Sequence, residues 1–236
     1  MEEDRSRSGK TKAKLIEAAG QVFFQRGFRA ATVREICRRA GTPLGAVNYH
    51  FRNKQGLYTA ILEHSYRLAI RKYPPHFGLG DEATPEERLR AFIRAFLLRI
   101  SDEGIPAWHM KLITREISDP TGALGNLVQG SIRPVYKYLA GILREILQEG
   151  GAAEGEESDS VFLCAMSIVG QCLHYLTDKR LIAVLHPERF DAGDIERIAD
   201  HITQFSLGGI RQLAHREAGS PEVIRSDPGC KPHGNI

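Results

Sequence analysis

Polar side chains suited to nucleic-acid recognition lie close together between Thr32 and Leu57, where the chain reads TVREICRRAGTPLGAVNYHFRNKQGL. The amide of Asn48 can make two hydrogen bonds with the edge of an adenine. Thr32 and Thr42 each place a hydroxyl at an expected helix start, where free backbone N–H groups bind phosphate. These residue types predict contacts with the bases and phosphates of a DNA duplex.

Two short helical patterns separated by a Gly-Thr-Pro corner must position these groups. Thr32 caps the first pattern, which has its apolar residues on one face. Gly41 can adopt the left-handed conformation that the corner needs, and Pro43 fits the first turn of the next helix. Asn53 then caps a further helix. This layout is that of a helix-turn-helix, whose second short helix enters the major groove.

The recognition helix is expected from about Pro43 to His50, with Val47 and Phe51 facing inward. Gly45 and Ala46 are small enough to let the helix backbone approach base edges or thymine methyl groups. A flexible basic arm, residues 1–10, could reach a neighbouring groove or phosphates. The outward-facing residues of the recognition helix are expected to be Leu44, Gly45, Ala46, Asn48, Tyr49 and His50.

The distribution of charge along the chain supports a DNA-binding surface in the segment up to Tyr58. Of the 236 residues, those up to Tyr58 include 12 Lys/Arg and 5 Asp/Glu, a net +7, whereas the remainder has 20 against 24, a net −4. The positive excess lies where a phosphate surface would need it.

The four cysteines have neither metal-type nor disulfide-type spacing, which fits a reducing cytoplasm. No signal peptide or membrane span is recognisable, so a cytoplasmic protein without a metal or cofactor is expected.

The periodicity of the apolar residues predicts an all-α fold of about nine helices in two domains. A helix-turn-helix domain is expected over 11–58, with Gly27 ending its first helix, and a ligand-binding and dimerisation domain over 59–215. A break at residues 74–84 and an acidic linker at 150–157 divide the helices of the second domain. Pro134 would begin or kink the helix in which it lies. A flexible tail is expected over 216–236.

Residues 11 to about 65 resemble the N-terminal domain of the TetR family of one-component bacterial repressors. The matching features are Phe23-Phe24-x-x-Gly27, Thr32-Val33-x-x-Ile36, Ala40-Gly41, Gly45-x-Val47-x-Tyr49-x-Phe51 and Asn53-Lys54-x-x-Leu57. Three later segments, Arg115 to Leu124, Ser167 to Tyr175 and Asp200 to Ile210, are similar to the CecR-like subgroup, whose members are linked to efflux and drug response.

The resemblance implies that Tyr49 and Lys54 contact phosphates and that His50 lies near the DNA backbone. Other readings stay open, because Tyr49 could be a core aromatic and His50 could make no contact. Thr32 caps its helix in either case. The chain departs from the common family pattern at Pro43 and Leu44, and also at Asn48, which takes a usually aromatic position. The operator sequence therefore cannot be transferred from the family.

The two C-terminal helices, expected at about 158–177 and 194–215, are the predicted homodimer surface. Their small and apolar residues would allow close approach in a four-helix interface, although the same pattern also fits an ordinary core. The residues expected in this interface are Ala165, Ile168, Val169, Cys172, Ile198, Ile202, Phe205 and Gly209.

The middle helices are expected to enclose a pocket for a small-molecule effector of unknown identity. The candidate residues are polar or aromatic groups on otherwise apolar helices, and each of them could equally be a satisfied core group. Arg115 and Glu116 could form a buried pair or orient a ligand. The candidates are Phe96, Trp108, His109, Met110, Arg115, Glu116, Tyr136 and His174.

These features predict a homodimeric repressor that binds a palindromic operator, is released by a ligand and controls efflux or drug-response genes. Activation is an open alternative, because a fold does not fix the sign of regulation. An enzyme is disfavoured, since the chain has no Gly-rich phosphate loop, no G-x-S-x-G elbow and no metal-type histidine pair. A helical interaction protein that does not bind DNA is the third alternative.

Overall fold

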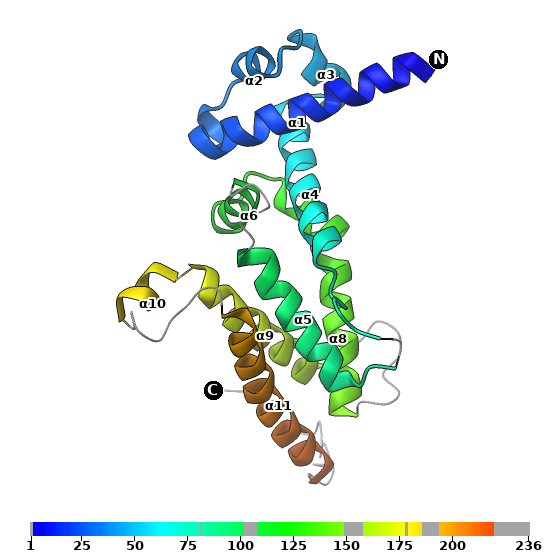
Figure 1. Ribbon diagram of the computed structural model, residues 1–236, viewed down its shortest axis with the longest axis vertical. Helices are drawn as coiled ribbons and strands as arrows, with labels where there is room; N and C mark the ends of the chain where they lie inside the picture. Colours follow the sequence, from blue (N-terminus) through cyan, green and yellow to red (C-terminus); the bar gives the residue numbers. More distant parts are fainter. Residues whose placement is uncertain are drawn as a thin grey trace, which may run out of the picture.

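The computed structural model describes residues 2–80, 82–101, 108–148, 158–177, 179–185 and 194–219. All regular secondary structure within these ranges is helical, which confirms the all-α prediction. Figure 1 shows a head of helices at one end and a helical bundle at the other, with α4 (Lys54–Lys72) running from the first toward the second. None of the helices described is long and apolar enough to cross a membrane.

The head consists of α1 (Glu2–Ala30), α2 (Val33–Ala40), α3 (Gly45–Phe51) and the first turns of α4. Apolar residues from all four helices fill its interior. The ring centroid of Tyr58 lies 4.9 Å from that of Phe23 and 5.0 Å from that of Phe28, so three aromatic rings join α1 to α4. The remaining buried head residues include Leu15, Val22, Ile36, Cys37, Val47, Phe51, Leu57 and Ile61.

The bundle has a separate apolar core to which α5, α8, α9 and α11 contribute. In Figure 1, α11 lies along α5 and α9 at the end far from the head. By contrast, α6 and α7 pack on α4 near the head. The elements of this half are α5 (Pro85–Ser101), α6 (Trp108–Ser118), α7 (Leu124–Leu127), the π-helix η1 (Val128–Ile132), α8 (Arg133–Leu147), α9 (Asp159–Thr177), α10 (Lys179–Leu185) and α11 (Ile195–Gly219).

Two differences from the sequence prediction concern the N-terminal helices. Residues 2–10 continue α1, so the expectation of a disordered arm is wrong. Five of the nine residues in this segment are Glu, Arg or Lys, which are good helix formers. The recognition helix begins at Gly45, two residues later than expected. Gly27 breaks the regular geometry near the end of α1 with φ 75° and ψ 169°, as expected of a helix-ending glycine.

Further differences lie in the bundle. Pro134 lies at the start of α8, directly after the π-helical turn η1. Because proline has no N–H to donate to the carbonyl four residues earlier, a widened turn accommodates it. The helix α10 was not predicted, and α11 extends beyond His215 to Gly219. The predicted linker at 150–157 and the tail from residue 220 onward lie outside the described residues.

Candidate DNA-binding and effector sites

Local capping interactions fix the helix-turn-helix as predicted. The Thr32 hydroxyl accepts a hydrogen bond from the Glu35 N–H at 3.2 Å, and the Asn53 side chain accepts one from the Gly56 N–H at 2.8 Å. Gly41 adopts the left-handed conformation with φ 64° and ψ 38°. The caps fix where α2 and α4 begin, and Gly41 ends α2 at the corner before α3. Each of these contacts involves residues no more than three apart, so they need no help from distant parts of the chain.

The recognition helix α3 has one buried face and one exposed face. Val47 is fully buried and Phe51 is 7% exposed, which confirms that both face inward. Tyr49 is 81% exposed and Leu44 is 54% exposed, so the alternative that Tyr49 is a core aromatic is wrong. Asn48 and Gly45 are also exposed, whereas Ala46 and His50 are half-buried. The outer face of α3 therefore offers an amide, a phenol and a backbone without bulky side chains.

Thr42 does not present its hydroxyl as expected. Its backbone N–H donates to the Cys37 carbonyl at 3.0 Å, which completes the corner after α2. The turn directs the side chain inward, and its hydroxyl oxygen is buried without a hydrogen-bond partner among the described residues. In this conformation Thr42 shapes the corner and offers no hydroxyl to a phosphate.

Lys54 has a positioning role that the sequence did not indicate. Its ammonium donates to the carbonyls of Phe28 and Ala31, each at 3.0 Å, and to that of Arg29 at 3.4 Å. It also lies 4.6 Å from the centroid of the Phe28 ring, within the range of a cation–π contact. These contacts tie the start of α4 to the end of α1. The phosphate contact that the family resemblance implies for Lys54 stays a prediction.

Helix α6 follows the bundle helix α5 in the sequence, but it packs against α1 and α4 of the head. A Cβ added at Gly20 of α1 would lie 2.3 Å from the Trp108 ring, so only glycine allows the two helices to approach this closely. The Arg115 guanidinium lies against Gly27, 3.1 Å from where a Cβ would be. The Lys111 ammonium lies 5.2 Å from the centroid of the Phe24 ring.

A buried carboxylate connects α6 to α4 and to the loop before α7. Glu116 is fully buried and accepts hydrogen bonds from the Thr121 N–H and hydroxyl, each at 3.0 Å, and from the Ala123 N–H at 3.2 Å. Burial and the Glu116 carboxylate, which accepts a hydrogen bond from the Tyr58 hydroxyl, raise the pKa of Tyr58. Glu116 therefore uses these donors. Because Arg115 is exposed, the two residues do not form a buried pair, and the alternative that they orient a ligand stays a prediction.

Family models match both halves of this arrangement. Residues 15–61 match the bacterial regulatory proteins of the tetR family. Residues 85–210, more than half of the chain, match the C-terminal domain of the HTH-type transcriptional dual regulator CecR. The chain belongs to the TetR family.

Individual proteins agree with this assignment. The HTH-type transcriptional regulator TtgR of Pseudomonas putida is 31% identical over 93 residues, which are 39% of this chain and 42% of that relative. The chain thus matches less than half the length of TtgR. The HTH-type transcriptional repressor NicS, also of Pseudomonas putida, is 26% identical over 216 residues, 86% of this chain and 92% of that relative. AibR, in a crystal structure with isovaleryl coenzyme A and operator DNA, shares the fold with TM-score 0.58 and 20% identity over 83% of this chain and 97% of that chain.

In this TetR-family chain the predicted effector residues are scattered. Trp108 and Glu116 belong to the junction of α6 with the head, and Arg115 lines a cleft beside Gly27. Phe96 and Tyr136 pack on the bundle core from α5 and α8. The candidates whose side chains are described thus lie at separate places in the fold, and one pocket formed by this set stays a prediction. His174 is exposed, and the side chains of His109 and Met110 lie outside the described residues.

The predicted dimer residues also need correction. Ala165, Ile168, Cys172, Ile198 and Ile202 are at most 7% exposed within one protomer, so they form the bundle core and cannot reach a partner. Because α9 is apolar nearly all round, its sequence could not show which side faces inward. Val169 is half-buried, whereas Phe205 and Gly209 are exposed as a dimer face requires. The exposed apolar residues beside them on α9 and α11 are Phe162, Leu163, Met166 and Leu213.

Arg99 is a buried cation that the sequence prediction missed. It is 6% exposed, and its guanidinium donates to the Tyr73 carbonyl at 2.7 Å. Burial lowers the pKa of Arg99 to about 10, so the side chain remains charged at neutral pH. Its position on the apolar stripe of α5 between Phe96 and Ile100 was the available signal, because a charge on such a stripe is expensive to bury.

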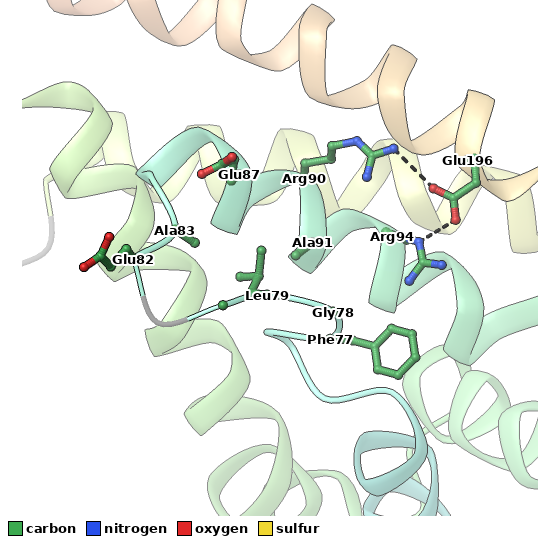
Figure 2. A pocket seen from close by; sticks show the side chains of 11 residues that line it. Phe77, Gly78, Leu79, Glu82, Ala83, Glu87, Arg90, Ala91, Arg94 and Glu196 are labelled. Atoms are coloured by element: carbon green, nitrogen blue, oxygen red, sulfur yellow. Dashed lines mark hydrogen bonds and ion pairs between the residues drawn. The ribbon is translucent and has the colours of Figure 1, made fainter.

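Two cavities of ligand size lie in the bundle half, and neither contains a predicted effector residue. The larger, about 890 Å³, lies between the loop after α4, α5 and the start of α11. Figure 2 shows that its arginines point to acidic partners, with Arg90 and Arg94 both paired with Glu196. The second, about 470 Å³, lies between α4 and the π-helix η1. Within the described residues, no group of three His, Cys, Asp or Glu could hold a metal ion.

Proposed function

We propose that this chain is a DNA-binding transcriptional regulator that acts as a homodimer and is released from its operator by a small molecule. The observation that carries the proposal is the geometry of α3, whose inner residues anchor it in the head while Tyr49 is 81% exposed. The net charge of +7 up to Tyr58 supports a phosphate-binding surface on the same domain.

We propose that the chain represses transcription of the genes it regulates. The relative NicS, matched over 92% of its length, is named a repressor. The description of the CecR model as a dual regulator makes activation the second candidate. A reporter gene under the chain's own upstream region would separate the two, because deleting a repressor raises expression and deleting an activator lowers it.

Gel-shift binding to DNA from that upstream region tests the main proposal. Tyr49→Ala should weaken binding to all sequences alike because it removes a phosphate contact, whereas Asn48→Ala should relax preference at one base pair, worth about 1–3 kcal/mol. Lys137→Gln, an exposed change on α8 far from α3, is the matched control. No salt-dependent binding by the wild-type protein would remove the proposal, and equal losses on every site for Asn48→Ala would remove its base-reading role.

The dimer is proposed to form through the exposed apolar face of α9 and α11. Leu163 is 59% exposed and Phe205 is 68% exposed, and apolar side chains grouped this way indicate an interface. Two copies would then place their recognition helices on successive turns of the duplex, ~34–36 Å apart. Phe205→Glu should shift the protein to a monomer in analytical ultracentrifugation and abolish operator binding. A wild-type protein that is monomeric at micromolar concentration would contradict this interface.

A further inference from the structure

The cavity of about 470 Å³ between α4 and η1 has the dimensions of a small-molecule site. One wall comes from α4, through His64, Arg67, Leu68 and Arg71 among others. The opposite wall comes from the π-helix and the start of α8, where Gly130, Ser131, Pro134 and Val135 line it. The cavity therefore joins the helix that leads out of the head to a segment of irregular helix, and π-turns are frequent at functional sites.

The polar part of this cavity is positive and its lining contains no carboxylate. Arg71 is exposed and makes no ion pair within the part of the chain that the structure describes. Arg67 has a distant partner, with 3.6 Å between its Nη1 and Glu63 Oε2, and its side chain is 66% exposed. Burial and the neighbouring Arg67 lower the pKa of His64, so at neutral pH this imidazole is mostly uncharged and does not add to the positive charge.

Most of the remaining lining is apolar, with Ser131 and the phenol of Tyr66 as the other polar groups. Leu68 and Val135 face the cavity from opposite walls, and the half-buried ring of Tyr66 lies beside them. The positive charge of the buried Arg99 acts on the Tyr66 phenol, so a further cation lies behind this wall. This contrasts with the cavity in Figure 2, whose arginines are already paired with acidic side chains.

We propose that the cavity between α4 and η1 binds an amphipathic organic anion, with its carboxylate or phosphate on Arg67 and Arg71 and its apolar part against Leu68 and Val135. The inference rests on the proposed function, because it makes this cavity the effector site of a ligand-released regulator. An anion held here would draw α4 toward η1. The same helix begins at Lys54, which is tied to the end of α1, so a shift of α4 reaches the head directly.

Binding to the full-length protein is measured by isothermal titration calorimetry with three probes of equal chain length. These are octanoate, octyl phosphate and the uncharged octanamide. At least one anion should bind at least about tenfold more tightly than octanamide, as expected for charge-assisted hydrogen bonds. The two anions distinguish a carboxylate from a phosphate effector. Equal affinity for all three probes, or no binding of either anion, overturns the proposal.

Variants localise the site. The double change Arg67→Gln with Arg71→Gln should remove the preference for the anion, while the matched control Lys137→Gln should keep it. Gly130→Leu adds a side chain whose Cβ would meet no atom within 4 Å, so it should obstruct the cavity and weaken binding of both anions. Anion binding that survives the double change places the site elsewhere and refutes the proposal.

Operator binding is measured for each variant first without and then with the anion. This separates failure of the proposed DNA-binding function from failure of the effector assignment of this cavity. Wild type and all variants should shift the operator alike, and only wild type and Lys137→Gln should be released by the anion. If no protein binds DNA, the proposed function fails irrespective of the calorimetry. If all bind DNA and the anion releases none of them, the effector assignment of this cavity fails and the DNA-binding proposal stands.

Discussion

Replacing Glu116 with alanine should destabilise the contact between the head and α6 more than any surface charge change. The carboxylate is fully buried and accepts hydrogen bonds from the Thr121 N–H and hydroxyl and from the Ala123 N–H. It also accepts one from the Tyr58 hydroxyl. Alanine would leave the Ala123 and Tyr58 donors in a dry interior, since these two residues are at most 1% exposed.

The size of the effect follows from the donors that lose their acceptor. Each buried donor without a partner costs about 1–3 kcal/mol, and Thr121 is half-buried, so water can replace part of what it loses. Two orphaned donors predict a loss of about 2–6 kcal/mol in the free energy of unfolding, a range that includes the about 3–5 kcal/mol lost when a buried charged pair loses one member. Glu116→Gln keeps one carbonyl oxygen as acceptor and should lose about half as much.

Urea denaturation followed by far-UV circular dichroism measures this loss. Glu145→Ala is the control, because Glu145 forms an exposed ion pair with Arg88 and such pairs contribute about 0–1 kcal/mol. Operator binding should fall together with stability, since α6 supports the head. A Glu116→Ala protein that unfolds within about 0.5 kcal/mol of Glu145→Ala would refute the reasoning, because it would mean that the orphaned donors find new partners at little cost.

Other predictions concern the same junction. Gly20→Ala should lower the melting temperature although alanine favours helices, because its Cβ would overlap the Trp108 ring, and Trp108→Leu in the same protein should restore part of the loss. The raised pKa of Tyr58 contributes stability that is fully present below its ordinary value of 10.0 and is lost as pH rises through the raised pKa, so wild type should lose stability above pH 10 more steeply than Tyr58→Phe in urea titrations at several pH values. Lys54→Met should cost about 1–3 kcal/mol in urea denaturation by leaving partly buried carbonyls without their donor, and unchanged stability would show that its three hydrogen bonds are dispensable.

The parts of the site that the sequence predicted correctly depend on interactions between near neighbours. The caps by Thr32 and Asn53 and the left-handed Gly41 are set by residues within a few positions, so the residue types alone indicate them. The inward direction of Val47 and Phe51 follows from helical periodicity for the same reason. By contrast, the Lys54 ammonium finds its acceptors 23 to 26 residues earlier in the chain, and no local pattern indicates that contact.

Helices with apolar residues on every side were the main source of error in the bundle. Cys172 and Phe205 are both apolar residues of C-terminal helices, but one is fully buried in the protomer and the other is 68% exposed. Periodicity predicts that α9 is buried on most sides and leaves open which neighbour covers each side. The effector candidates illustrate a related difficulty, because a polar residue on an apolar helix such as Glu116 can be satisfied by backbone donors of a nearby loop.

The apolar core of the head shows why a boundary after Tyr58 does not divide the molecule into independent parts. Trp108, Leu112, Ile113 and Leu127 lie in the same buried cluster as the residues of α1 and α4. Close packing transmits displacement, because a dense interior cannot deform without moving its neighbours. A ligand that moves α4 or η1 therefore acts on side chains that already form part of the head's interior. In the proposed response to an effector, coupling to DNA binding then needs no separate relay. It needs only two packings of α4 and α6 on α1 for which effector and DNA have different affinities, with a typical coupling free energy of about 1–3 kcal/mol.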